Sequence, residues 1–357
     1  MQRRRLAGWL MSAVAVVSCA VQAGCSGAGS AAQHAATAFL AAYVLPDGRV
    51  ARPDQGNDTV SEGQAYGLLL AEATGKPAMF DRIWQWTRDH LQLPNGLFAY
   101  HANAAGRLLS TEPASDADLL IAWALLRYRG PDAASRHQAG QRVAAAVLAQ
   151  EVTTGPDGAP ILAAGPWATG QPASLNPSYW ALPALTSLSQ LTGDARWQQL
   201  ADEAVALTGH LTEGGRRLPP DWAEFTDPGS LAPTAAPNGS EWQAQYGLDA
   251  QRTVIWFAAS CDPRARALAG RWWALLRRPG RAQAQALKLN GHILKPDANP
   301  LPLVAAAAAA HAAGQQSASS QLLQQARTQQ HSYPTYYGGA WAALAPALLG
   351  GALHSGC

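Results

Sequence analysis

Helical periodicity runs through almost the whole chain, and proline and glycine interrupt it at regular points. Proline is favoured in the first turn of a helix, and glycine is favoured just beyond its end. These markers are Pro77, Pro131, Pro177, Pro263 and Pro300 at or shortly before expected starts, and Gly75, Gly130, Gly193 and Gly314 after expected ends. The pattern predicts about twelve helices, at residues 33–43, 61–74, 78–92, 115–129, 134–150, 177–192, 194–209, 247–259, 263–278, 301–313, 316–329 and 335–349.

The connections between these segments are unequal in length. Long loops fall at 44–60, 93–114, 151–176, 210–246 and 279–299, whereas the other connections are tight. Twelve helices with this alternation fit an all-α (α/α)₆ barrel, in which inner and outer helices alternate and the long loops gather at one end. Two stacked helical bundles are the alternative. Strand signals are sparse, with short stretches near 97–100 and 161–163.

Composition narrows the class of protein. Of 357 residues, 48% are hydrophobic and 14% are charged, which favours a compact fold with a large core. A net charge of +2 predicts no strong attraction to nucleic acid. The 13 tryptophans are many for this length, and tryptophan rings provide flat surfaces on which sugars stack.

The N-terminus has the pattern of an export signal. Arg3, Arg4 and Arg5 precede an apolar stretch at 6–17 that is too short to span a bilayer comfortably. We therefore expect a signal peptide at 1–23 and an exported protein, periplasmic or secreted. Two cysteines, Cys19 and Cys25, offer lipoprotein processing as an alternative, with a signal ending before Cys19. Contact with a membrane is expected only if one of them is lipidated.

A flexible leader is predicted at 24–33, followed by a single catalytic domain at 34–353, since no linker divides the remainder. Beyond the leader there are two cysteines, Cys261 and Cys357. They allow one disulfide in an oxidising compartment, and the sequence does not decide whether they pair.

Three carboxylates, Glu62, Asp116 and Asp249, lie at or near the starts of three well-separated predicted helices. Acids are favoured at the positive end of a helix for electrostatic reasons alone, by about 0.3–1 kcal/mol each. If the helices pack as one barrel, however, the three acids meet at the same end. Acids that converge in a cleft lined with tryptophan and tyrosine indicate hydrolysis of a sugar polymer.

The local sequence around two of these acids suggests ordinary helix capping. Ser61 and Gln64 have the spacing of a capping box, which places Glu62 at the first helical position. Ser115 and Asp118 are predicted to play the corresponding roles beside Asp116.

Other neighbours favour a functional interpretation. Gly63 and Gly67 are weak helix formers in the first two turns after Glu62, so we expect a group packed closely against the backbone. Arg252 lies three residues after Asp249 on the same helical face, where its guanidinium would keep the carboxylate ionised. Glu62 has no such cation nearby in sequence, which suits a general acid. The helix N-terminus should lower its pKa, so burial or an ionised Asp116 must outweigh the dipole.

Two other motifs have structural explanations as well as functional ones. Asn176-Pro177-Ser178-Tyr179 is a helix start that projects Tyr179 from the first turn. Pro219-Pro220-Asp221-Trp222 is a rigid turn whose tryptophan is either a packing plug or part of a cleft wall. The chain has no nucleophile elbow, phosphate-binding glycine loop or dinucleotide fingerprint, and its nine histidines show no metal-ligand spacing. We expect neither a cofactor nor a metal ion.

Together these motifs resemble glycoside hydrolase family 8, and within it the periplasmic endoglucanases that accompany bacterial cellulose synthases. The resemblance runs through most of the chain after the signal. Its anchors, in order, are the segment 61–67, the segment 114–118 with Ile121-Ala122-Trp123, Asn176-Pro177-Ser178-Tyr179, Pro220-Asp221-Trp222, and Asp249 with Arg252. In two places the chain departs from the family pattern: Leu248 precedes Asp249, and Phe98 and Tyr100 stand where a tryptophan platform is expected.

The resemblance implies an (α/α)₆ barrel that hydrolyses β-1,4-glycans with inversion. Glu62 then matches the general acid, and Asp249 matches the general base that activates water. Asp116 matches the acid that holds the distorted sugar. The resemblance places Tyr179, Arg252, Tyr333 and Tyr336 along the same site.

From these observations we expect an exported endo-β-1,4-glucanase, a cellulase, that acts on cellulose-like chains and is linked to a cellulose synthesis and secretion complex. One alternative is a glycan-binding or scaffolding protein of a secretion machine without turnover. Another keeps the hydrolase but changes the substrate to chitosan or xylan. A polysaccharide lyase fits less well, because lyases usually need a Tyr/His pair or a metal-assisted base.

Overall fold

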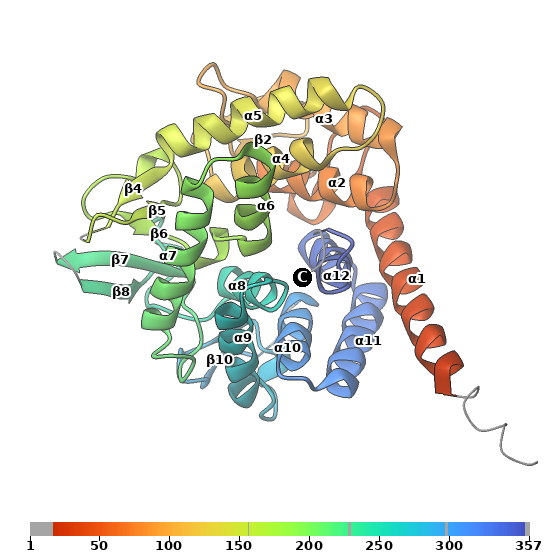
Figure 1. Cartoon of the computed structure of the whole chain (residues 1–357), viewed down its shortest axis with the longest axis vertical. Helices are drawn as coiled ribbons and strands as arrows, with labels where there is room; N and C mark the ends of the chain where they lie inside the picture. The colour runs from red at the N-terminus through yellow and green to blue at the C-terminus, as the bar shows by residue number, and fades with distance from the viewer. Residues whose placement is uncertain (1–16, 156, 228–229, 297–298, 354–357) are drawn as a thin grey trace, which may run out of the picture.

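The computed structural model describes residues 17–155, 157–227, 230–296 and 299–353. Within these residues twelve α-helices form two concentric layers (Figure 1). The inner layer comprises α2 (Ser61–Ala73), α4 (Ser115–Arg127), α6 (Leu182–Thr192), α8 (Leu248–Ala258), α10 (Leu301–Ala312) and α12 (Tyr336–Leu349). The outer layer comprises α1 (Val17–Tyr43), α3 (Pro77–Leu91), α5 (Ala133–Gln150), α7 (Arg196–Leu211), α9 (Pro263–Leu276) and α11 (Gln316–Ser332).

The inner helices form a closed ring, in which each contacts the next and α12 contacts α2. Each outer helix packs against an inner neighbour along the chain, except that α1 packs mainly on α12. This arrangement is an (α/α)₆ barrel, and it confirms the predicted fold class. Because inner and outer helices alternate in direction, all six inner helices begin at the same end of the barrel.

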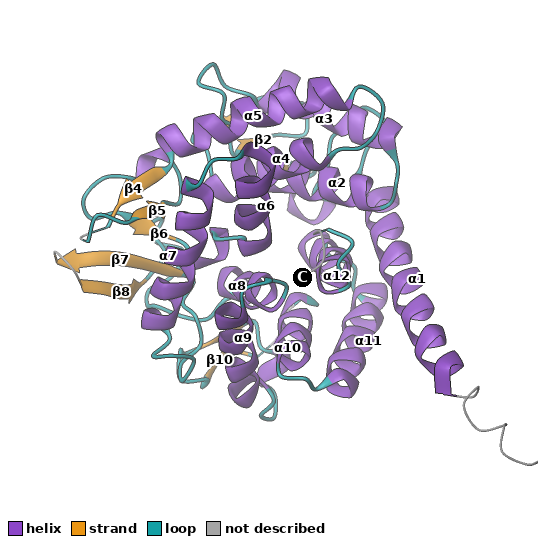
Figure 2. Cartoon of the chain, in the orientation of Figure 1, coloured by secondary structure: helices purple, strands orange, loops and turns teal. Residues whose placement is uncertain are grey.

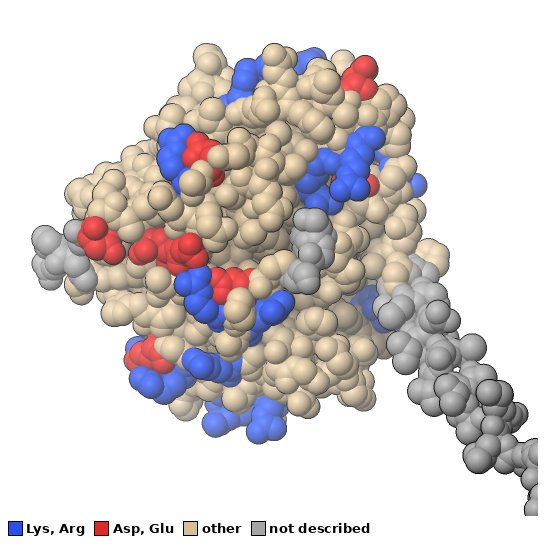
Figure 3. Space-filling model, viewed as in Figure 1, with Lys and Arg blue, Asp and Glu red and all other residues tan. Residues whose placement is uncertain are grey.

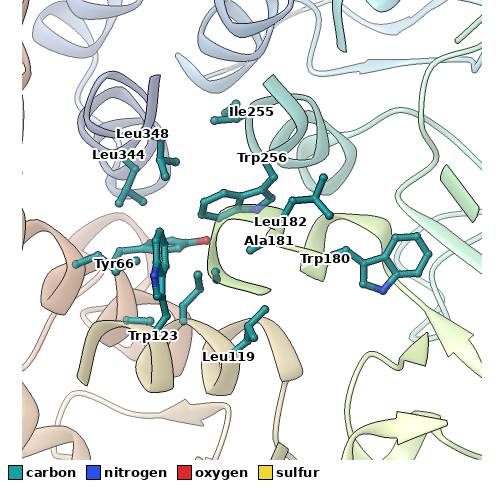
Figure 4. Packing of buried hydrophobic residues seen from close by; sticks show 14 of the residues in the cluster. Tyr66, Leu119, Trp123, Trp180, Ala181, Leu182, Ile255, Trp256, Leu344 and Leu348 are labelled. Atoms are coloured by element: carbon teal, nitrogen blue, oxygen red, sulfur yellow. The ribbon is translucent and has the colours of Figure 1, made fainter. Parts of the chain in front are cut away.

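The centre of the ring is a packed core and not a pore (Figure 4). Tyr66, Trp123 and Trp256 point into it from α2, α4 and α8. Trp341 of α12 meets Trp256 edge to face at 5.2 Å and Tyr66 at 5.5 Å. Truncation of such buried aromatic side chains generally costs about 3–5 kcal/mol, so these contacts hold the ring together.

Short strands occupy the loops (Figure 2). The sheets are small and antiparallel: one joins β1, β2 and β3, another joins β6, β7 and β8, and two-stranded pairs join β4 to β5 and β9 to β10. The strands are β1 (Thr59–Val60), β2 (His101–Ala102), β3 (Leu108–Ser110), β4 (Val152–Thr154), β5 (Pro160–Leu162), β6 (Ser174–Leu175), β7 (Trp222–Asp227), β8 (Ser230–Thr234), β9 (Ala286–Leu287) and β10 (Ile293–Lys295). The β7–β8 hairpin lies in a segment predicted as loop, because its residues lack a clear alternating pattern.

One predicted helix is interrupted. The segment 177–192 consists of a short 3₁₀ helix, η3 (Pro177–Tyr179), and the separate helix α6. Pro183, near the start of α6, has no N–H to donate, and its ring would clash with the carbonyl of Tyr179 in a continuous helix. The break aims η3 and α6 in different directions, so that η3 packs against α8.

The predicted capping box of α2 is wrong. Ser61 is the first helical residue rather than the cap, a position that Val60 takes without a side-chain hydrogen bond. Gln64 does not reach back to the helix start. Its side chain accepts a hydrogen bond from the N–H of Val50 at 2.5 Å and donates one to Thr87 Oγ1 at 2.8 Å. Glu62 therefore stands second in the helix, and Gln64 fixes the preceding loop to α3.

The predicted cap of α4 is also wrong. Ser115 is the first helical residue, and its hydroxyl donates to the carbonyl of Ala163 at 2.5 Å. Asp118 is fully buried and accepts a hydrogen bond from the N–H of Phe98 at 2.8 Å. Tertiary contacts thus replace the local bonds that the sequence suggested.

The leader predicted as flexible at 24–33 lies within α1. The last turns of α1 pack on the barrel through Phe39 and Leu40, while its beginning projects from it (Figure 1). Once a helix is nucleated by packed residues, each further residue adds a hydrogen bond at little cost, so the helix extends outward. Residues 1–16 of the predicted signal peptide lie outside the described residues.

Charged side chains are sparse on the face shown in Figure 3, where acidic and basic groups mostly lie beside one another in small areas among uncharged residues. Among the described helices, none combines the length and apolar character that crossing a bilayer requires.

Candidate active site

A cleft of about 780 Å³ lies at the end of the barrel where the inner helices begin. The first turns of α2, α8 and α12 contribute Glu62, Asp249 and Tyr336 to it. The remaining walls come from the long connections, as the unequal loop lengths predicted. They supply Arg52, Tyr100, Glu112, Trp167, Trp222, Glu241 and Asn299, among others.

Arg252 joins the three predicted acids. Its Nη1 donates to Asp116 Oδ2 at 2.8 Å and lies 3.7 Å from Glu62 Oε2. Its Nη2 donates to Asp249 Oδ1 at 2.8 Å. The pairing of Asp249 with Arg252, predicted from their spacing, is confirmed. The structure therefore brings together three carboxylates that are far apart in the sequence.

Glu62 is held in a poorly solvated position, with its side chain 17% exposed. Burial raises the pKa of Glu62 to about 7, and the negative charges of Asp116 and Asp249 add to the rise. Arg252 and Arg52 oppose it. Burial and the neighbouring Asp116, the two influences that the sequence required, both act to raise this pKa. A carboxyl group with this pKa is substantially protonated near neutral pH, as a proton donor must be.

Asp249 has a different setting. Its side chain is 31% exposed, and each of its oxygens accepts a hydrogen bond. Oδ1 accepts from Arg252, and Oδ2 accepts from Asn176 Nδ2 at 2.9 Å. Asn176 also caps η3, the helix start predicted here, by accepting from the N–H of Ser178 at 3.0 Å. Its second role, orienting Asp249, was not predicted.

Asp116 lies behind the cleft wall. It is buried, its Oδ2 accepts from Arg252, and its Oδ1 accepts from the N–H of Ala117 at 2.8 Å. Burial raises the pKa of Asp116, and the charge of Arg252 opposes this rise. Its predicted contact with a distorted sugar stays a prediction, while its electrostatic effect on Glu62 follows directly from the geometry.

Aromatic side chains line the cleft near Asp249. Tyr179 lies under Arg252, whose guanidinium carbon is 5.3 Å from the ring centroid. The ring centroid of Trp222 lies 6.1 Å from that of Tyr179 and 6.4 Å from that of Trp167. Because Trp222 lines the cleft, the turn at Pro219–Trp222 supplies part of its wall. Trp167 is 44% exposed and offers a flat surface for a sugar ring.

Of the predicted tyrosines, Tyr336 lines the cleft and Tyr333 does not. Tyr333 follows the last residue of α11 with its side chain 78% exposed, and Tyr337 lies in the cleft instead. The three tyrosines are nearly adjacent in sequence, and only the direction of α12 determines which of them face inward. On the opposite loop, Phe98 is buried whereas Tyr100 lines the cleft.

The glycines beside Glu62 are explained by close packing, as predicted. A Cβ on Gly63 would collide with the hydroxyl of Tyr336, and one on Gly67 would lie 2.9 Å from Val50 Cγ2. Gly63 therefore lets the first turn of α12 approach the helix that carries Glu62.

Two charged residues of the site escaped sequence reasoning. Asp221 is buried, and its Oδ1 accepts from the N–H groups of Gly247 and Ala250 at 3.0 and 2.7 Å, so it caps α8 just before Asp249. Arg52 lines the cleft beside Glu62. Asp221 lies in a motif that was interpreted through its tryptophan. Arg52 lies in a loop with no recognisable pattern. In the part of the chain that the structure describes, no cluster of three metal-ligating side chains is present.

Comparison with known families agrees with this geometry. The model of the glycosyl hydrolases family 8 matches residues 5–272. The chain belongs to this family. An endoglucanase of Cellulomonas uda is 31% identical over 261 residues, covering 71% of this chain and 70% of its own. A probable endoglucanase of Novacetimonas hansenii is 31% identical over 252 residues, covering 66% of this chain and 70% of its own.

Solved structures of family 8 enzymes share the fold. Endoglucanase Cel10 from Klebsiella pneumoniae superposes with a TM-score of 0.73 at 28% identity, over 87% of this chain and 97% of its own. The endo-β-1,4-glucanase CMCax from Acetobacter xylinum gives a TM-score of 0.71 at 26% identity, over 89% of this chain and 97% of its own. This chain is a glycoside hydrolase built on the same barrel.

Proposed function

We propose that this family 8 enzyme is an endo-β-1,4-glucanase that hydrolyses cellulose-like chains with inversion, using Glu62 as general acid and Asp249 as general base. The observation that supports the roles is the contrast between the two carboxyl groups. Glu62 has a pKa raised to about 7 by burial, whereas Asp249 accepts hydrogen bonds from Arg252 and Asn176 that hold its carboxylate in place.

Arg252 bridges the two carboxyl groups. They contact different amino groups of the Arg252 guanidinium, at 3.7 Å for Glu62 and 2.8 Å for Asp249. Inverting enzymes separate their carboxyl groups by roughly 6.5–9.5 Å so that a water molecule fits beside the sugar. We expect the carboxyl groups of Glu62 and Asp249 to lie in that range.

The proposed reaction is a single displacement. Glu62 gives its proton to the glycosidic oxygen as the bond from that oxygen to C1 breaks. Asp249 takes a proton from a water molecule whose oxygen attacks C1 from the opposite face. The products are two shorter chains, and the acid and base have exchanged protonation states. A proton transfer through solvent restores them for the next cycle.

The substrate assignment rests on relatives and on the walls of the cleft. The two relatives described above are named as an endoglucanase and a probable endoglucanase, and one solved structure is named as an endo-β-1,4-glucanase. Trp167, which is exposed, offers an apolar face on which the flat face of a glucose ring can stack, and Trp222 and Tyr179 line the cleft beside it.

The test is product analysis of the purified protein with carboxymethylcellulose and cello-oligosaccharides. We expect new reducing ends from internal cleavage, and NMR should show that the first product formed is the α-anomer. A β-anomer as first product would refute inversion. Binding of cello-oligosaccharides with no release of reducing ends would instead identify a glycan-binding protein, and faster cleavage of chitosan or xylan oligomers would change the substrate.

We further propose that the protein is exported and works beside a cellulose synthesis and secretion complex. Arg3–Arg5 and the following apolar stretch support export, and so does the disulfide bond of Cys261, since disulfides persist mainly in oxidising compartments. Cys357 lies outside the described residues. The link to a synthase rests on the motif resemblance alone. Fractionation of the native bacterium, with mass spectrometry of the mature N-terminus, tests export and lipidation, and co-purification with the synthase tests the partnership.

A further inference from the structure

A second arginine lies in the cleft, and the proposed mechanism does not use it. Arg52 belongs to the loop that precedes α2, and it lines the cleft together with Glu62 and Tyr336. Its side chain is 17% exposed. A cation at this depth needs a counter-charge, because removing a charge from water is costly unless the charge is paired.

The guanidinium of Arg52 is fixed from one side only. Nε donates to Asp58 Oδ1 at 2.7 Å, and Nη2 donates to Asp58 Oδ2 at 2.6 Å. Asp58 Oδ2 in turn lies 2.7 Å from His101 Nε2 of strand β2. This two-bond geometry sets the plane of the guanidinium rigidly. The remaining amino group, Nη1, has no hydrogen-bond partner among the described residues, so its donors are free for a ligand in the cleft.

Arg252, the other arginine of the cleft lining, differs in this respect. Its Nη1 donates to Asp116 and Tyr66, and its Nη2 donates to Asp249 and Ser178. These four bonds leave little capacity to bind a substrate, and the side chain is buried. Arg252 therefore holds the three acids in place. Arg52, by contrast, keeps N–H groups that can donate hydrogen bonds to a sugar hydroxyl.

The position of Arg52 indicates which sugar it meets. Asp54, two residues on, accepts from the N–H of Tyr336 at 3.2 Å, and the hydroxyl of Tyr336 lies against Gly63 beside Glu62. Arg52 therefore belongs to the wall that carries the acid. Asp249 lies on the other wall, with Asn176 and Trp222. Because the acid protonates the oxygen of the departing chain, the sugar that carries this oxygen must come close to Glu62, and hence to the wall that holds Arg52.

We propose that Arg52, oriented by Asp58 and His101, donates a hydrogen bond to the leaving-group sugar and so helps to select a glycan on that side of the cleavage point. This inference rests on the proposed function, since it presumes that Glu62 is the acid. It assigns a substrate-binding role to a residue outside all the recognised motifs.

The test compares two substrates that differ only in the leaving group. Cellotetraose leaves with a sugar, whereas β-cellotriosyl fluoride loses fluoride as its C1–F bond breaks and water supplies the new C1–O bond. For Arg52→Gln we expect kcat/KM with cellotetraose to fall about 10- to 100-fold, the usual loss for a hydrogen bond from a charged donor. Hydrolysis of the fluoride should be unchanged, which also shows that the variant is folded.

Two further variants separate binding from an indirect effect on Glu62. Arg52→Lys keeps the positive charge but lacks the planar pair of donors that Asp58 orients, so it should also lose activity on cellotetraose without a shift in the pH profile. Arg136→Gln removes an ion pair with Asp81 on the outer helices and serves as the matched control, with both substrates unaffected.

Several outcomes would overturn the proposal. These are an equal loss on both substrates, full activity of Arg52→Gln on cellotetraose, or a loss that disappears when each variant is assayed at its own optimal pH. If the unmodified enzyme hydrolyses neither substrate, the proposed function fails instead, and the two failures are thereby distinguishable.

Discussion

The two walls of the cleft hold their carboxyl groups in opposite ways. On one wall Glu62 is desolvated, and its nearest cation, Arg252, stays at 3.7 Å. On the other wall Asp249 is more exposed and accepts two hydrogen bonds of 2.8 and 2.9 Å, one of them from the same arginine. One guanidinium thus serves both groups but contacts them unequally.

The difference shows how a helical barrel produces an acid and a base from similar starting positions. Both residues lie in the first turn of an inner helix, where the helix dipole favours the charged form of each. Burial and the neighbouring Asp116 reverse that preference at Glu62. At Asp249 a partner from another segment, Asn176, donates a hydrogen bond that orients the carboxylate. The tertiary neighbours, and not the helix ends, separate the two roles.

The largest loss of activity should come from Asp249→Ala, which removes the base from its wall of the cleft. Activation of water would be lost for every leaving group, so cellotetraose and β-cellotriosyl fluoride should both be hydrolysed about 10³- to 10⁴-fold more slowly. Steady-state rates on both substrates measure this. Sodium azide, a nucleophile that needs no base, should restore part of the fluoride rate. Normal hydrolysis of the fluoride by this variant would show that Asp249 is not the base.

Glu62→Gln should affect only one of the two substrates. Without a proton donor, we expect cleavage of cellotetraose and carboxymethylcellulose to fall about 10²- to 10⁴-fold, while the fluoride, a good leaving group, is still hydrolysed. Retained hydrolysis of the fluoride also reports that the protein is folded. Glu213→Gln, at an exposed site beyond α7, is the control and should behave like the unmodified enzyme. Undiminished cleavage of the polymer by the Glu62→Gln variant would show that Glu62 is not the general acid.

Asn176→Ala tests whether the base is positioned by its hydrogen bond. Loss of the contact to Asp249 Oδ2 should lower kcat by about 10- to 100-fold with little change in KM, since small misplacements of a catalytic group are costly. Asn95→Ala removes an exposed hydrogen bond to Gln150 and is the matched control. A change in KM alone would assign Asn176 to substrate binding instead.

The smallest predicted effect is a pH shift. Since burial raises the pKa of Glu62 to about 7, kcat/KM should fall as pH rises through that value, because the acid loses its proton. Asp116 adds to the rise, so Asp116→Asn should lower the pKa of Glu62 and move this alkaline limb down by about one pH unit. Asp89→Asn, at an exposed position of α3, should leave the limb in place. An alkaline limb that stays or moves upward in Asp116→Asn would contradict the electrostatic account.

Much of the fold was predictable because helix boundaries are local. Proline and glycine marked most of the helix ends, and the unequal connections predicted that the long loops gather at the cleft. The errors were local signals that distant contacts overrode. Gln64 and Asp118 resembled capping residues, but they bond to other segments of the chain. The break at Trp180 and Ala181 also went unpredicted, although Pro183 marks it.

Prediction of the site was uneven for the same reason. Glu62, Asp116 and Asp249 were found because each lies at a helix start within a recognisable motif, and the pair Asp249–Arg252 has a fixed spacing on one helix. Tyr333 does not line the cleft and Tyr337, which does, was not predicted, since which tyrosine faces the cleft depends on how α12 meets α2. Arg52 and Asp221 act through partners that no local pattern reveals.

The sequence by itself determined the helices, their alternation and the three acids, because periodicity, proline and glycine placement and residue chemistry are properties of short segments. Only the tertiary structure decided which acid is protonated, which cation still has donors to offer and which aromatic rings line the cleft. Those properties depend on burial and on charges brought together from distant parts of the chain, and in this barrel they meet where the inner helices begin.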